Sequence, residues 1–220
     1  MDPWPYDGDV ARGPFLPIRH GTAVASILAR EAPDAALVPF RYPRPDMGRM
    51  ADLVARAASD GVRILALPLG SSSREDWTAL ADALARYDIL SVVSAGNDGR
   101  DIDAAPVWPA ALGLDQIIVV TSSDGSGRLA QGSNWGVRNV DVMLPGENVD
   151  VTDFRGASGS ASGTSYAVPR LAALAARLLA RDPEQNTAEL KAAILARAIP
   201  SPYEDHPVTS AGWIPDPLAD

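Results

Sequence analysis

Hydrophobic and polar residues along this chain follow two alternating patterns. Residues 20–32 carry Val24, Ile27 and Leu28 at helical spacing, and a short apolar run at 35–40 follows them. The same order recurs further along, where amphipathic segments are separated by near-continuous apolar runs. The pattern predicts helices at 20–32, 46–61 and 74–88, and strands at 35–40, 62–70, 89–97 and 116–123.

Apolar strands that alternate with helices are typical of a parallel sheet that is buried on both faces. The sequence therefore predicts an α/β fold with three layers: a doubly wound, mostly parallel sheet with helices on both sides. Residues 132–149 add a short strand bounded by turns, and two further helices are predicted from about residues 163 and 183. Residues 200–220 hold five prolines and are expected to form an irregular tail. No repeat or long linker divides the chain, so residues 1–220 are expected to form one domain.

Composition and charge narrow the classes of function. The formal net charge of −9 argues against a general binder of nucleic acid or anionic membranes, because such proteins place basic patches against phosphate. The absence of cysteine excludes disulfides, thiolate chemistry and cysteine-ligated metals. No apolar run approaches about 18 residues, and Met1 is not followed by a basic and then apolar leader. We therefore expect neither a membrane span nor a signal peptide, and the localisation is left open.

Three polar residues occupy positions where chemistry collects in α/β sheets. His20 opens a predicted helix, Asn97 directly follows the stretch "ILSVVSAG" of the third predicted strand, and Ser165 lies at another helix start. Each has an ordinary structural interpretation: a histidine or serine at a helix start often caps the helix, and "GNDG" is a typical turn. The three together, at strand ends and helix starts, favour a reactive site.

The stretch "GASGSASGTSYAVPRLAALAARLLA" changes abruptly from a loop composition to an apolar helix. Gly163 lets the backbone approach a substrate, and Thr164 can fix the turn. Ser165 then lies beside the unpaired N–H groups and the positive dipole end of the helix, which suit a developing oxyanion. Pro169 falls early in the helix, where a missing N–H costs least.

The segments "HGTAVASI", "SAGNDG" and "SGTSYAVPRLAAL" resemble, in the same order, the histidine, oxyanion-asparagine and serine motifs of subtilisin-like serine proteases. The resemblance extends over about residues 17–198, including "ILALPLGSSS" and "GSNWGVRNVDVMLPG". It implies a serine endopeptidase in which Ser165 is the nucleophile, His20 the general base and Asn97 the oxyanion donor. The chemistry of the three residues agrees with these roles. A hydroxyl is a poor nucleophile unless a base of pKa near 7 can take its proton, and an asparagine amide donates hydrogen bonds at any pH.

The resemblance also implies how a substrate would bind. Leu69 and Gly70, with Ala95 and Gly96, would flank a peptide or protein substrate that adds as an extended strand. Pro68 stands where a polar residue is expected and removes one backbone donor. No cofactor is expected, no calcium ligands are assignable, and the oligomeric state is left open.

The aspartate of the family's triad has no clear counterpart in the sequence. In the family it ends an apolar strand before the histidine, whereas no such strand precedes His20. Asp7-Gly8 echoes the motif without that context, so we expect the aspartate to lie outside these 220 residues, either because the sequence starts late or because the chain is shortened. The alternative function is a catalytically impaired homologue that binds peptides or proteins. Without the aspartate, we expect only trace activity that rises with pH, and little effect of Asp7→Ala.

Overall fold

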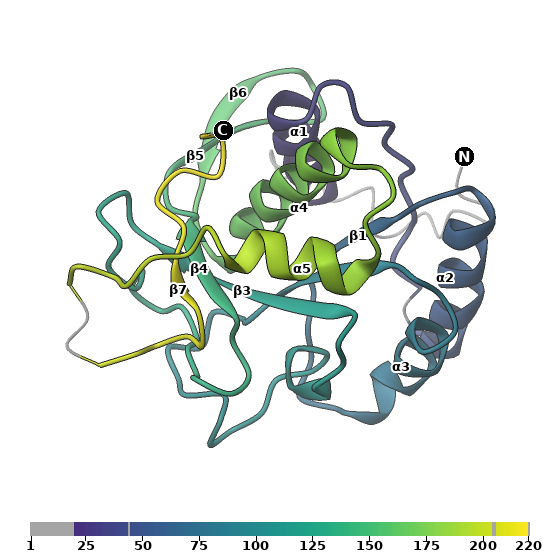
Figure 1. Ribbon diagram of the computed structural model, residues 1–220, viewed down its shortest axis with the longest axis horizontal. Helices are drawn as coiled ribbons and strands as arrows, with labels where there is room; N and C mark the ends of the chain where they lie inside the picture. Colours follow the sequence, from purple (N-terminus) through teal and green to yellow (C-terminus); the bar gives the residue numbers. More distant parts are fainter. Residues whose placement is uncertain (1–19, 44, 204–205, 220) are drawn as a thin grey trace.

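The computed structural model describes residues 20–43, 45–203 and 206–219, and it is built around one parallel sheet (Figure 1). The strand order is β1-β2-β3-β4-β7, and every neighbouring pair is parallel. Among the described residues, β1 lies at one edge of the sheet and pairs with β2. The strands are β1 (Ile64–Leu67), β2 (Leu90–Ser94), β3 (Ile117–Ser123), β4 (Val142–Pro145) and β7 (Gly212–Trp213).

Two layers of helices cover the sheet, because side chains of the central strands alternate between its faces. Val93 and Val119 point into a core shared with α2 and α3, whereas Val92 and Ile118 point into a second core shared with α4 and α5. This arrangement confirms the predicted three-layer, mostly parallel α/β fold. The helices are α1 (His20–Glu31), α2 (Met50–Ser59), α3 (Thr78–Leu84), α4 (Thr164–Arg181) and α5 (Thr187–Leu195), with short 3-10 turns at Met47–Arg49, Glu75–Trp77 and Ala110–Leu112.

The prediction of a strand at residues 35–40 is wrong, because the structure has no strand there. Leu37 and Val38 are exposed by about two fifths of their surface (42% and 39%). The apolar run has the composition of a strand, but among the described residues no strand pairs with it. A β conformation needs a neighbouring backbone to satisfy its N–H and C=O groups.

Three strands were not predicted from the sequence. β5 (Val149–Thr152) and β6 (Ser158–Ala161) form an antiparallel hairpin, and Val149 and Val151 pack against Ala23 and Ile27 of α1. β7 lies inside the tail that was predicted to be irregular, and it adds to the edge of the main sheet beside β4.

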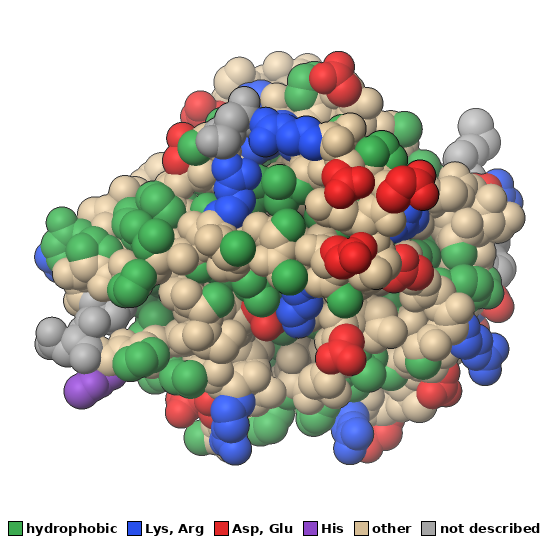
Figure 2. All heavy atoms as spheres, viewed as in Figure 1, with side chains coloured by type: hydrophobic (Ala, Val, Ile, Leu, Met, Phe, Trp, Pro, Cys, Tyr) green, Lys and Arg blue, Asp and Glu red, His purple; other side chains and the backbone are tan. Residues whose placement is uncertain are grey.

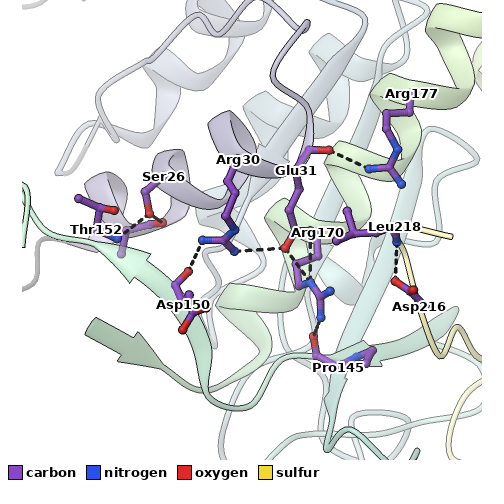
Figure 3. Close-up of polar contacts among 11 residues, drawn as sticks. Ser26, Arg30, Glu31, Pro145, Asp150, Thr152, Arg170, Arg177, Asp216 and Leu218 are labelled. Atoms are coloured by element: carbon purple, nitrogen blue, oxygen red, sulfur yellow. Dashed lines mark hydrogen bonds and ion pairs between the residues drawn. The ribbon is translucent and has the colours of Figure 1, made fainter. Parts of the chain in front are cut away.

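α1 is fastened to α4 by a buried charge cluster, which Figure 3 shows. The carboxylate of Glu31, 4% exposed, accepts two hydrogen bonds from Arg170 Nε at 3.1 and 3.2 Å. Arg170 also donates to the backbone of Pro145 at the end of β4, and Arg177 donates to the Glu31 carbonyl. The two helices that begin at His20 and Thr164 are thereby fixed to each other and to the sheet.

The face that carries α4 and α5 has acidic side chains near its centre (Figure 2), in keeping with the net charge of −9. Asp182, Glu184 and Glu189 line a shallow hollow there. No helix of the described residues is long and apolar enough to cross a membrane.

Candidate active site

Ser165 lies in the first turn of α4, at the carboxyl edge of the sheet. Its hydroxyl donates a hydrogen bond of 3.3 Å to the carbonyl of Pro68, which directly follows β1. Gly163 precedes the helix with φ +126°, a conformation that side-chain-bearing residues rarely adopt, and a Cβ there would lie 3.2 Å from Asn97 Oδ1. The glycine therefore allows the start of α4 to approach the loop after β2.

Asn97 is in that loop, and its side chain reaches the same helix start. Asn97 Oδ1 accepts hydrogen bonds from Thr164 N at 3.0 Å and from Thr164 Oγ1 at 3.1 Å. Because a backbone N–H can only donate, the atom facing it must be the amide oxygen. The NH2 group of Asn97 is therefore the end of the amide that remains available to an incoming group.

His20 is the first residue of α1, and its ring packs against Tyr166, the neighbour of Ser165. The two ring centroids are 5.9 Å apart, and the planes are tilted by 55°. Although much of His20 is exposed to solvent, the atoms packed around the ring desolvate it and lower its pKa below the usual 6.5. The ring is therefore mostly neutral at pH 7, the form that can accept a proton.

The three predicted residues thus come from three separate segments and gather around the start of α4. Ser165 and Asn97 are connected through Thr164, and His20 is next to Tyr166. Among the described residues, however, no hydrogen bond joins Ser165 to His20, because the Ser165 hydroxyl donates to Pro68 instead.

The predicted substrate-binding residues follow two neighbouring strands. Leu67 of β1 is in register with Val93 of β2, so Leu69 and Gly70 leave the sheet beside Ala95 and Gly96. Ala95 is fully buried, and its N–H and C=O are bonded to Val120 and Asn134, so it offers a ligand no free backbone group in this structure.

Three contributors to the site were missed or understood only in part from the sequence. Thr164 supplies both hydrogen bonds to Asn97, and Tyr166 packs on His20. Asn134 is fully buried beneath the loop of Asn97. The motif spacing drew attention to the helix start, but nothing local in "GSNWG" indicates where Asn134 lies.

Two expectations stay open at this site. Asp7 lies outside the described residues, so the position of a triad aspartate is untested. Within the described ranges, no group of three or more His, Asp or Glu side chains could hold a metal ion.

Comparison with known proteins decides the family. A model of the Subtilase family matches residues 18–213. The chain belongs to the subtilase family. This subtilase is 31% identical over 192 residues to the thermophilic serine proteinase of Bacillus sp. (strain AK1), which covers 80% of this chain and 45% of that protein. It is 29% identical over 191 residues to the minor extracellular protease Epr of Bacillus subtilis (strain 168), covering 78% of this chain and 28% of that protein.

The fold of this subtilase is also found among solved structures. A cold adapted subtilisin-like serine proteinase superposes with a TM-score of 0.78 at 24% identity, covering 91% of this chain and 75% of the other. The chain spans less than half the length of the two curated relatives, at 45% and 28%. The family and the fold are therefore shown, as the sequence motifs predicted.

Proposed function

We propose that this subtilase acts as a serine endopeptidase on peptide or protein substrates. The observation that carries the proposal is the contact between Asn97 Oδ1 and the backbone N–H of Thr164, one residue before Ser165. This contact occupies the oxygen end of the Asn97 amide, so the NH2 group is the end that would donate to a substrate held at Ser165. A hydroxyl with a fixed amide donor next to it is the arrangement that acyl transfer requires.

In the proposed reaction, Ser165 Oγ attacks the scissile carbonyl carbon while His20 accepts the hydroxyl proton. The carbonyl oxygen becomes the oxyanion of a tetrahedral intermediate, to which Asn97 donates a hydrogen bond. The C–N bond then breaks as His20 returns the proton to the leaving amine. Water, deprotonated by His20, attacks the acyl ester and releases the carboxylic acid and the free Ser165.

For this reaction the Ser165 hydroxyl must turn from the Pro68 carbonyl toward His20. Catalytic hydrogen bonds are often long or absent without substrate and tighten in the complex. Rotation about the Cα–Cβ bond of a partly buried serine is a low-energy change between staggered states.

The substrate would lie as an extended strand between the segments after β1 and β2, near Leu69, Gly70 and Gly96. Free backbone groups at such edges pair with a peptide's main chain.

A second function is favoured by the Ser165–Pro68 hydrogen bond. If that contact persists with substrate bound, the chain binds peptides without turnover, as a catalytically impaired homologue does. The same residues would bind the peptide in both functions, so binding alone does not separate them.

Turnover of internally quenched peptides separates the two functions. We expect the chain to cleave a mixed-sequence set of such peptides slowly, as a subtilase without its triad aspartate would, and Ser165→Ala to reduce this cleavage to background, because the nucleophile is lost. Ser160→Ala is the matched control, because Ser160 is an exposed serine in β6 of the same segment. Binding of the peptides without cleavage in the unmodified chain would favour the second function.

A further inference from the structure

The side chain of Asn134 fills the inside of the loop at residues 95–100. Its exposed surface is 0%. Its Oδ1 accepts from the backbone N–H groups of Asp98 at 3.0 Å and Arg100 at 3.1 Å. Its Nδ2 donates to the carbonyl of Ala95 at 2.9 Å and to Asp98 Oδ2 at 3.3 Å. One amide group thus makes four hydrogen bonds to a loop of six residues.

The backbone of Asn134 is fixed from both sides as well. Its N–H donates to the carbonyl of Gly96 at 3.0 Å, and its own carbonyl accepts from the buried Thr121 Oγ1 of β3 at 2.5 Å. Gly96 has φ +97°, and a Cβ there would lie 2.6 Å from Asn134 Nδ2. The loop is therefore shaped around this amide and is connected through it to the central sheet.

Asn97 lies between two residues that Asn134 holds, Gly96 and Asp98. An oxyanion donor is effective only when it is fixed before the reaction, because it then needs no reorganisation as charge develops. Misplacement by about 1 Å can cost about 100-fold in rate.

We propose that Asn134 is a positioning residue that holds the 95–100 loop so that the Asn97 amide meets Thr164 and presents its NH2 group beside Ser165. This inference rests on the proposed endopeptidase function. A buried asparagine can also be a satisfied core residue with no further role. Here, among the described residues, every hydrogen bond of the side chain goes to Ala95, Asp98 or Arg100, which concentrates its effect on the loop of Asn97.

Asn134→Asp tests the proposal in the full chain, with a fluorophosphonate as the probe of Ser165. The substitution keeps acceptors for the N–H groups of Asp98 and Arg100 but replaces the donor to the Ala95 carbonyl with a carboxylate oxygen. We expect the maximal rate of labelling to fall about 10- to 100-fold, with little change in the probe concentration that gives half-maximal rate.

Asn139→Asp is the matched control. Asn139 Nδ2 donates to the carbonyl of Ile102 at 3.1 Å, so the variant loses the same kind of bond just outside the loop. We expect its labelling rate to equal that of the unmodified chain. The labelling rate of each variant is measured at a temperature far below the midpoint of its thermal unfolding, so that differences in the folded fraction do not affect the rates.

A double-mutant cycle with Asn97→Ala distinguishes positioning from a general structural effect. If Asn134 acts through Asn97, then Asn134→Asp adds little to the loss caused by Asn97→Ala. Two results would overturn the positioning role alone. One is a double variant in which the rate losses of the two single variants multiply, and the other is an Asn134→Asp variant that is labelled as fast as the unmodified chain. If Ser165 of the unmodified chain is not labelled at all, the proposed function fails and the positioning role with it.

Discussion

At the residue scale, the chemistry of the site depends on which end of the Asn97 amide faces Thr164. Thr164 donates from its backbone N–H, so the oxygen end is fixed and the NH2 end is left for a ligand. This detail could not be read from "SAGNDG", because the motif indicates a turn with an amide but not the direction of that amide. The sequence predicted Asn97 as a site residue, and the structure identifies Thr164 as its hydrogen-bond partner.

Replacement of Asn97 should act on turnover and not on binding. An oxyanion donor contacts the reacting oxygen mainly in the transition state, so Asn97→Ala should lower kcat by about 10²- to 10³-fold and leave KM nearly unchanged. Steady-state kinetics on a quenched peptide measure both constants. A rise in KM at constant kcat would contradict the oxyanion role.

The pH dependence of labelling should report the His20 ring. Only neutral imidazole can accept the Ser165 proton, so the rate should rise with pH as His20 deprotonates and then level off. Because desolvation lowers the His20 pKa, the midpoint should lie below the usual 6.5. Tyr166→Ala uncovers one side of the ring and should move the midpoint upward, toward 6.5. A midpoint above 6.5 in the unmodified chain would contradict this environment.

At the element scale, the site depends on α1 and α4 staying in register, and the Glu31–Arg170 pair joins them (Figure 3). Glu31→Ala leaves the guanidinium of Arg170, 15% exposed, buried without its partner. Loss of one member of a buried ion pair typically costs about 3–5 kcal/mol, so the free energy of unfolding in urea should fall by that amount.

Asp60→Ala is the control for that measurement. Asp60 pairs with Arg56 at 2.8 Å on the exposed face of α2, an i,i+4 pair worth about 0.3–0.5 kcal/mol. If the two variants lose the same stability, the buried cluster does not anchor the helices as argued.

The elements also show where sequence patterns succeed and fail. β2 and β3 were predicted because apolar runs buried on both faces need no detailed knowledge of their neighbours. Residues 35–40 have a similar composition, yet no described strand pairs with them. β6 reads "SGSA", which favours no strand, and it forms because β5 offers it a backbone to pair with. Pairing is a property of two segments, and local composition describes only one.

At the scale of the whole molecule, the fold class followed from the order of helices and strands, and the family from the motifs on them. The tail was expected to be irregular because it is rich in proline. Trp213 and Ile214 are nevertheless buried, and Gly127 leaves room for the Trp213 ring. Such long-range packing has no signal in the local sequence. That residues 1–220 form a single domain, and that Asp7 has no catalytic part, stay predictions.

The central claim is that the chain carries one reactive serine, activated where α1, α4 and the loop after β2 meet. Peptide mapping after treatment of the full chain with a fluorophosphonate tests this claim most directly. We expect one modified residue, Ser165, with labelling lost in Ser165→Ala, strongly slowed in His20→Ala and unchanged in Ser160→Ala. Label on other serines, or label that persists in Ser165→Ala, would contradict the account.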